Sequence, residues 1–182
     1  SDRRNVTVGG DVEMVDKDVT ITNPTNAAFF LEAQPNLSSE RFGGFVQWRG
    51  GIGAAEFELG ARLDRTSQTA GVSQLGTAVP MGPSMLAAAF AASGREQSDT
   101  TVDVVARAWV PMGEIVPRVT LSRKTRVPSL LERFAWLPTE ASYGLADGNI
   151  YVGNQSLKPE VAYAVEAGVD FDGGAFTLRP TA

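Results

Sequence analysis

Residues Ser122 to Glu160 read SRKTRVPSLLERFAWLPTEASYGLADGNIYVGNQSLKPE. This stretch ends one strand-like segment, crosses a long polar loop and leads into another strand-like segment. On both sides of it, segments in which apolar and polar residues alternate are joined by short turns and long loops in succession. That succession is typical of an antiparallel up-and-down meander in a transmembrane β-barrel. We therefore expect an all-β chain, and specifically a six- to seven-strand sector of a large transmembrane β-barrel.

The alternation gives each segment one apolar and one polar face, because successive side chains of a strand point to opposite sides. It is cleanest in Gly53–Asp64, and Phe45 interrupts the polar face of its own segment. Charged side chains such as Glu58 and Arg62 fall on the polar face, so we expect the apolar face to carry no charge. The segments are Asn5–Met14, Arg41–Arg49, Gly53–Asp64, Asp99–Val110, Glu114–Arg123 and Val161–Asp172, and a seventh begins near Ala175.

The connections are of two kinds. Short glycine-containing turns are predicted at Arg49–Gly51, Pro111–Gly113 and Asp172–Gly174, and long loops at Val15–Glu40, Thr66–Ser98 and Lys124–Glu160. Loops of that length are rare in compact soluble domains, whereas outer-membrane barrels have short turns on one rim and long loops on the other. The alternative that the pattern leaves open is a soluble β-sandwich, a binding or adhesion module with long recognition loops.

The composition restricts the chemistry. The chain has 182 residues and a net charge of -5, and it contains neither cysteine nor histidine. Without a thiolate or an imidazole, we expect no enzymatic activity and no cofactor. The basic residues are interleaved with acidic ones, which does not favour nucleic-acid binding. No run of about 18 apolar residues occurs, so no segment is predicted to cross a membrane as a helix.

Two motifs in the opening stretch resemble those of a known family. The first is Arg-x-Pro-Ser-Leu-x-Glu-Arg-Phe, at Arg126 to Phe134, and the second is Gly-Asn-x-x-Leu-Lys-Pro-Glu, at Gly153 to Glu160. Together with VAYAVEAGVDF at 161–171 and GARLDR at 60–65, they are similar to the barrel of TonB-dependent outer-membrane receptors. Within that family, SRKTRVPSLLERFAW and DGNIYVGN look most like the copper or heavy-metal branch.

The resemblance implies energy-coupled uptake of a metal ion or metal chelate, of the siderophore or copper type, in the bacterial outer membrane. The implied partners are outer-membrane lipid, the metal substrate, and TonB, which would be reached through a plug domain. A family barrel has about 22 strands. We therefore interpret residues 1–182 as a single partial β-barrel domain, and we expect the plug domain, the TonB box and the closing strands to lie outside it.

Candidate substrate-contacting residues lie in the two later loops. Met81 and Met85 carry thioethers, soft donors that suit Cu(I), and the alternative is that they pack as apolar residues of a short helix beginning after Pro83. In the last loop, aromatic side chains are candidates for stacking on a chelate, and two polar side chains are candidates to supply oxygen atoms. Such aromatics also serve as interfacial girdle residues or as anchors of a loop. These candidates are Trp136, Tyr143, Tyr151, Asp147 and Asn149.

Two further groups are expected to be structural. Glu56 and Glu58 share one strand face, where we expect them to pair with basic residues of neighbouring strands in a hydrated wall. Acid–base work by this pair would need a third group, and the sequence identifies none. Arg126, Glu132 and Arg133 are expected to brace the rim, with Glu132 buried between the two arginines.

Overall fold

The computed structural model describes residues 4–137, 151–174 and 177–181. In these residues seven antiparallel strands form one sheet in the order β1-β2-β3-β4-β5-β8-β9, and β6 and β7 form a second, two-stranded sheet. The strands are β1 (Asn5–Asn23), β2 (Asn26–Ile52), β3 (Ala55–Thr69), β4 (Glu96–Trp109), β5 (Ile115–Arg126), β6 (Trp136–Leu137), β7 (Tyr151–Val152), β8 (Glu160–Asp172) and β9 (Thr177–Leu178), and the helices are α1 (Met81–Ala92) and α2 (Leu130–Phe134). The predicted all-β up-and-down meander is confirmed.

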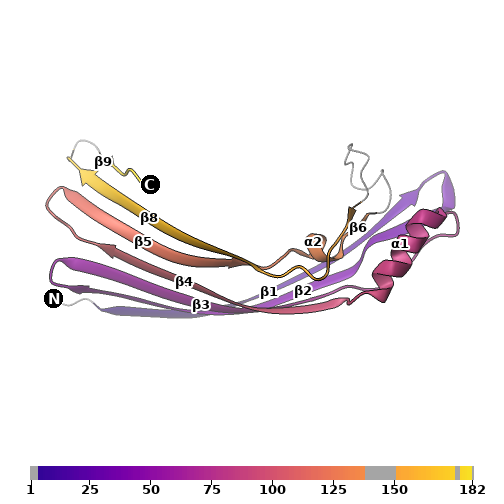
Figure 1. Cartoon of the computed structure of the whole chain (residues 1–182), viewed down its shortest axis with the longest axis horizontal. Coiled ribbons are helices and arrows are strands. Elements are labelled where there is room, and N and C mark those ends of the chain that lie inside the picture. Colours follow the sequence, from indigo (N-terminus) through magenta and orange to yellow (C-terminus); the bar gives the residue numbers. More distant parts are fainter. Residues whose placement is uncertain (1–3, 138–150, 175–176, 182) are drawn as a thin grey trace.

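The large sheet is curved, and α2 and β6 lie on the inside of the curve (Figure 1). We call this side the inner face and the opposite side the outer face. The end that carries α1 and α2 is the loop end, and the opposite end, where β2 turns into β3 and β4 into β5, is the turn end (Figure 1). The long connections between β3 and β4 and between β5 and β8 share the loop end, as the alternation of short turns and long loops predicts.

The predicted long loop at Val15–Glu40 is wrong. β1 continues to Asn23 and β2 begins at Asn26, so only Pro24 and Thr25 form the turn. The register between the two strands shifts between Lys17 and Val19 and again between Val19 and Thr20. A bulge changes the face that later side chains take. The apolar–polar alternation already stops at Val15, an inner-face residue that packs against the core, and the register shifts interrupt it further from Lys17 on. This hid the extended hairpin in the sequence.

The turn predicted at Arg49–Gly51 is also misplaced. β2 extends to Ile52, and Gly53 and Ala54 form the turn, with Gly53 at a φ of 63°. A positive φ carries little steric cost in glycine, so the turn falls at the third glycine of the run. The turn predicted at Pro111–Gly113 is confirmed to within a residue, with Gly113 at a φ of 65°.

The other two long connections are confirmed with shorter bounds. Residues 70–95 join β3 to β4 and contain α1, and residues 127–159 join β5 to β8 and contain α2. Helix α1 begins at Met81, before Pro83. Proline is tolerated there because the N–H groups of a first helical turn have no intrahelical acceptor.

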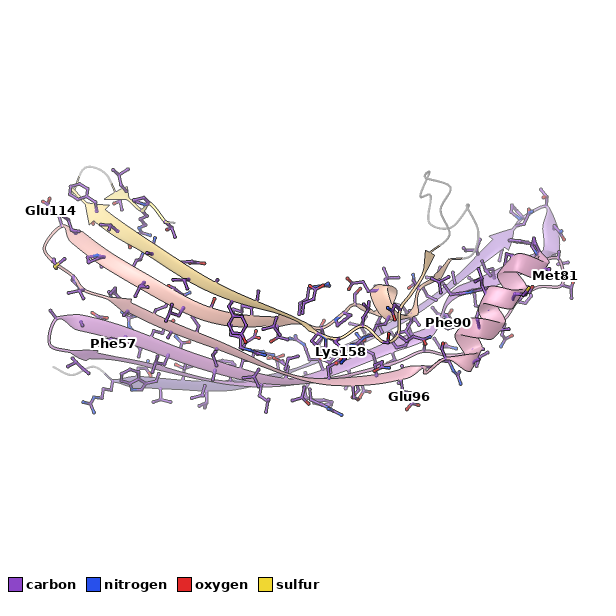
Figure 2. The ribbon with its side chains drawn as sticks, viewed as in Figure 1. Phe57, Met81, Phe90, Glu96, Glu114 and Lys158 are labelled. Carbon is purple, nitrogen blue, oxygen red and sulfur yellow. The ribbon has the colours of Figure 1, made fainter. Side chains whose placement is uncertain are left out.

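A buried apolar core exists at the loop end, on the inner face, where α1 and α2 meet β2. Its buried members are Leu31, Leu37, Ala87, Phe90, Leu130, Phe134 and Trp136. Toward the turn end, apolar side chains of the outer face are exposed, such as Val8 at 71% and Val165 at 72%, and Figure 2 shows side chains projecting from both faces of a single layer. In the part of the chain that the structure describes, no second sheet covers the outer face, which argues against the sandwich alternative.

None of the described helices has the length and hydropathy to cross a membrane.

Candidate functional site

The inner face carries a connected set of charges on β1, β2 and β3. The guanidinium of Arg62 donates to both carboxylate oxygens of Asp11, at 2.7 and 3.0 Å, and to both of Asp64, at 2.7 and 2.6 Å. Arg41 lies 2.7 Å from Glu13 and 3.6 Å from both Asp11 and Asp64. These ion pairs tie three neighbouring strands together and give the inner face a charged, hydrogen-bonded surface.

Gly43 makes the Arg62 bridge possible. It lies between the two carboxylates, because it pairs with Asp11 on one side and with Asp64 on the other. A Cβ at position 43 would overlap Nη2 of Arg62 and Oδ1 of Asp64. The arginine therefore crosses β2 only because this position has no side chain, and sequence periodicity gives no sign of that requirement.

We expect Gly43→Ala to destabilise the protein by about 1 kcal/mol or less, the range of partly exposed ion pairs, because only the ends of two flexible side chains have to move. The added methyl group must displace Arg62 and break its bridge to Asp11. The measurement is the urea midpoint of the purified, folded protein. The matched control is Gly44→Ala, which points to the outer face and meets only the carbonyl oxygen of Gly9, at 3.9 Å. An equal loss in both variants would contradict the assigned role of Gly43.

Toward the turn end, the inner face continues as pairs between neighbouring strands. Glu58 lies 3.3 Å from Arg107, and Glu56 lies 2.9 Å from Arg49. Both glutamates thus have the structural role predicted for them. Two hollows line this face: a mainly polar one of about 330 Å³ spans β1 to β5 below α2, and a mixed polar and apolar one of about 320 Å³ lies near Glu58 at the turn end. The arrangement provides a hydrated, charge-lined wall.

The first family motif folds into a corner at the loop end. Ser129 caps α2: its hydroxyl accepts from the N–H of Glu132 at 3.2 Å, and its own N–H donates to the Glu132 carboxylate at 2.7 Å. Arg126 donates two hydrogen bonds to the same carboxylate, at 2.8 and 2.9 Å, and a third to Glu160 at 3.0 Å. Arg126 therefore joins the end of β5, the helix cap and the start of β8, which is the predicted bracing role.

The structure gives Arg133 a different role from the one predicted. Its side chain is 1% exposed and points away from Glu132, toward the strands. It donates to Asp99 at 2.6 Å, to Gln68 at 2.9 Å and to the carbonyl oxygen of Leu157 at 2.8 Å. Glu132, with a half-exposed side chain, is thus not buried between two arginines. In place of one Arg126–Glu132–Arg133 cluster, the structure has two separate contacts. Arg126 pairs with Glu132 at the surface, and Arg133 pairs with Asp99 inside the corner.

The Arg126 guanidinium, followed by the backbone N–H and the hydroxyl of Ser129, lowers the pKa of Glu132 to about 2 from its ordinary value of 4.5. A carboxyl with a lowered pKa in the folded state stabilises that state above its unfolded pKa, and the contribution is lost as the pH falls through the folded value. We expect the corner to persist down to about pH 3 and to open near pH 2. Carbon-13 NMR of the Glu132 carboxyl measures this directly. In Arg126→Gln the titration should move up toward 4.5, and an unchanged midpoint would contradict the assignment.

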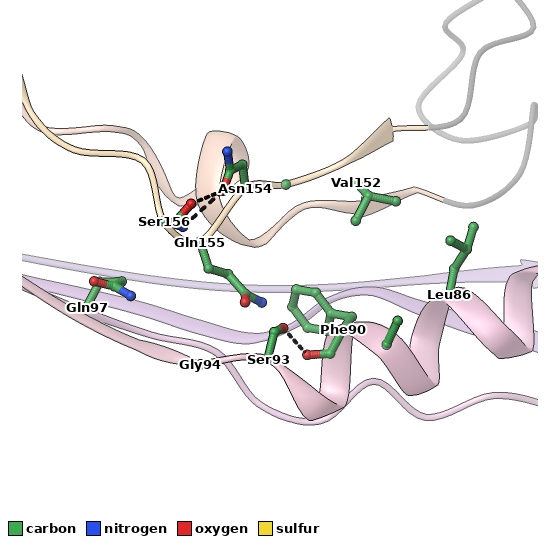
Figure 3. Close-up of a pocket in the computed structure, with 11 residues that line it drawn as sticks. Leu86, Phe90, Ser93, Gly94, Gln97, Val152, Asn154, Gln155 and Ser156 are labelled. Atoms are coloured by element: carbon green, nitrogen blue, oxygen red, sulfur yellow. Dashed lines mark hydrogen bonds between the residues drawn. The ribbon is translucent and has the colours of Figure 1, made fainter.

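A cavity of about 520 Å³ lies between the end of α1 and the loop that follows β7. Figure 3 shows Phe90 and Ser93 on one side and Asn154, Gln155 and Ser156 on the other. Nε2 of Gln155 is buried and has no hydrogen-bond partner among the described residues. The cavity therefore combines an apolar wall with the side chain of Gln155, whose buried amide nitrogen lacks a partner in the part of the chain that the structure describes.

The two methionine candidates lie on one exposed helix face. Met81 and Met85 are one turn apart in α1, with exposed fractions of 78% and 68%. The buried residues of the helix, Ala87 and Phe90, face the core. The structure thus leaves both thioethers accessible, at the far loop end of the molecule, where Figure 2 labels Met81.

The candidates of the last loop fall into two groups. Trp136 is fully buried in the core with Phe134 and Leu37, so in this conformation it anchors the loop and does not face a ligand. Tyr151 is the first residue of β7. Tyr143, Asp147 and Asn149 lie outside the described residues.

Within the predicted strand segments, the expectation of a charge-free apolar face fails at Arg123. Arg123 pairs with Val104 and Tyr163, and cross-strand partners share a face, so Arg123 lies on the outer face. The sequence contains the signal, because Arg123 has the same parity as Val119 and Leu121 in its strand.

Comparison with known proteins adds a family and a fold. The family model described as "TonB dependent receptor-like, beta-barrel" matches residues 3–181. Among solved structures, the chain is similar to one described as "Copper transporter OprC", with a TM-score of 0.66 and 13% identity, over 98% of this chain and 26% of that chain. The chain thus spans about a quarter of that transporter, and at this identity the likeness shows the fold alone. No curated protein sequence matches the chain.

Proposed function

Because this chain belongs to the TonB dependent receptor-like β-barrel family, we propose that it forms one sector of a transport barrel for a metal ion or metal chelate. Barrels of this family reside in the bacterial outer membrane, and the family consists of transporters and receptors, not enzymes. The inner face lines the lumen, the loop end faces the exterior, and the outer face contacts lipid. Energy comes from TonB, through a plug domain that residues 1–182 are not expected to include.

The observation that carries the proposal is the contrast between the two faces of one sheet. The inner face holds ion pairs that cross from strand to strand, as between Arg62 and Asp11. The outer face exposes aliphatic side chains such as Val8 and Val165. Outer-membrane barrels have this distribution, with an apolar band toward lipid and a polar interior, and they carry their long loops on the extracellular rim. A wall of this kind conducts a polar solute and performs no chemistry.

For cargo contact, we propose the residues of the two later loops. Met81 and Met85 provide two accessible thioethers, a donor set that suits Cu(I), and the similarity in fold to a copper transporter agrees with this choice. Tyr143, Tyr151, Asp147 and Asn149 are proposed as chelate contacts. The cavity beside Gln155 offers room for a small ligand next to α1. Trp136 holds the start of this loop against the core.

The test is metal uptake by a strain that lacks the gene and is complemented with variants, supplied either with copper or with an iron siderophore. If copper is the cargo, Met81→Leu with Met85→Leu will lower copper accumulation several-fold, because leucine keeps the volume and removes the sulfur. The control is Met112→Leu, which changes a methionine that is 58% exposed at the turn end. If growth on the iron siderophore requires the gene and copper uptake does not, the cargo is the metal chelate and not the copper ion. No effect of the deletion on either supply would refute metal transport.

A further inference from the structure

Two arginines, Arg65 and Arg123, lie on the outer face near the loop end. Arg65 pairs with Phe42 and Thr100, and Arg123 with Val104 and Tyr163. Cross-strand partners share a face, and Phe42, Val104 and Tyr163 are exposed apolar or aromatic residues of the outer face. Both cations therefore project from the side that the proposed function turns toward lipid.

Their partners differ from those of the other strand arginines. The arginines of the inner face and the rim corner each contact at least one carboxylate; they are Arg41, Arg49, Arg62, Arg107, Arg118, Arg126 and Arg133. Within the described residues, Arg65 and Arg123 have only neutral partners. Arg65 donates to the Thr100 hydroxyl at 2.9 Å, and Arg123 donates to the Thr125 hydroxyl at 3.0 Å and to the carbonyl oxygen of Val102. Each guanidinium thus keeps an uncompensated charge.

The two arginines also mark a boundary on the outer face. From β2 to β3 the first outward charge moves toward the turn end by two residues, since Glu40 pairs with Ser67, two residues beyond Arg65. On β4 the first outward charge is Glu96, which pairs with Thr69. Arg123 follows the same step across two strands, because its partner Val104 is four residues past Thr100, the partner of Arg65. Tilted strands make a level plane cross neighbours at shifted registers. From each arginine toward the turn end, the outer-face positions of β3 and β5 carry no charge, so both arginines lie at the loop-end edge of the apolar band.

An apolar groove begins beside Arg123. It has a volume of about 560 Å³ and lies on the outer face, over the row formed by Leu59, Ala106, Leu121 and Val165. Ala106 is the smallest side chain of that row, so the surface is lowest there. Tyr163, 77% exposed, stands next to Arg123 at the loop end of the groove. The guanidinium of Arg123 turns toward Val102 and Thr125, away from the groove and toward the loop end.

We propose that the outer face of β3, β4 and β5 binds a phosphate-bearing lipid of the outer leaflet, with Arg65 and Arg123 as phosphate ligands and the groove as the seat of an acyl chain. The inference rests on the outer-membrane location proposed above. An arginine presents several donors that match phosphate oxygens, and a long cationic side chain near a membrane edge extends its charge to the interface. The groove lies on the hydrocarbon side of the two charges, where the chain of such a lipid would be.

The test uses the protein purified from membranes and transferred to phosphatidylcholine nanodiscs, with diphosphoryl lipid A as the probe. Native mass spectrometry counts the lipid A molecules that remain bound. We expect retention by the wild type and a loss of roughly fivefold in apparent affinity for each of Arg65→Gln and Arg123→Gln, since a basic side chain near an anionic surface contributes about 1 kcal/mol. Arg107→Gln removes the same charge from the inner face and should leave retention unchanged.

The outcomes distinguish a failure of the proposed lipid site from a failure of the proposed membrane location. Equal retention of diphosphoryl lipid A and of its dephosphorylated form, or equal retention by both outer-face variants and the wild type, would overturn the phosphate site. Competition by millimolar inorganic phosphate at constant ionic strength would show a site for free phosphate and refute the lipid as occupant. Failure of the wild type to enter phosphatidylcholine bilayers would refute the membrane location itself. Insertion together with unselective lipid retention would leave the location standing and remove only the lipid site.

Discussion

Replacing Arg133 by methionine will destabilise the loop end more than any other single change in the corner, by about 3–5 kcal/mol. The guanidinium is 1% exposed and is the cationic partner of Asp99 at 2.6 Å. Without it, a carboxylate that is mostly buried, the Gln68 side-chain oxygen and the carbonyl oxygen of Leu157 all lose a donor. An uncompensated buried charge is costly, whereas methionine restores only the apolar volume.

The measurement is the temperature at which the detergent-solubilised protein loses its folded mobility on a gel, together with protease cleavage within residues 127–159. Arg126→Met is the matched control, because it removes the same side chain from a half-exposed pair and should cost much less than the loss of a buried partner. Should the protein fail to accumulate, Arg133→Lys still decides the question, since a lysine keeps the charge and cannot reach all three acceptors. Equal stability of the Arg133 and Arg126 variants would refute the internal role of Arg133.

A charge introduced on the outer face will have the second largest effect. Val119 lies midway along β5 on that face and is paired with Ala108 and Ala167. If the face contacts lipid, Val119→Arg will destabilise the folded, inserted protein by about 2–4 kcal/mol, the cost of an arginine near the bilayer midplane. The measurement is the denaturant midpoint of the protein folded in phosphatidylcholine vesicles.

The control for this change is the adjacent residue. Thr120 points to the inner face, between Arg107 and Glu166 of the neighbouring strands. Because that surface is hydrated and charged, Thr120→Arg should shift the denaturant midpoint by well under half of the shift that Val119→Arg causes. If Thr120→Arg is the more damaging of the two, the inner face is packed and the outer face hydrated, and the membrane orientation is the reverse of the one proposed.

Much of the wall is predictable because it repeats one local rule. Alternation along β3 separates Leu59 and Leu63 from Glu58 and Arg62, and this assigns both faces without knowledge of the strand pairing. The rule fails where the backbone departs from a regular strand. Past Met14, the inner face of β1 turns apolar at Val15, which packs against the core, and register shifts follow from Lys17 on, so the alternation predicts a loop where a paired hairpin exists.

The contacts inside the corner cannot be predicted from one sequence. Gln68 and Asp99 look like ordinary polar strand residues, and they are separated from Arg133 by 65 and 34 positions. Only the pairing of β3 with β4, which places Thr66 opposite Asp99, brings them under α2. The contact between Arg126 and Glu132 is easier to predict, because the two residues are six positions apart in the sequence and Glu132 belongs to a helix cap.

The join between β5 and β8 bears on how such receptors diversify. Arg126 and Glu160 are partners in the register and also form an ion pair at 3.0 Å, so the two ends of the 127–159 segment are fastened to each other at its base. A loop whose two ends are held together at its base can change in length and composition without disturbing the strand pairing below it. Exchange of this segment between related barrels should therefore alter the loop end and leave the pairing of β5 with β8 intact.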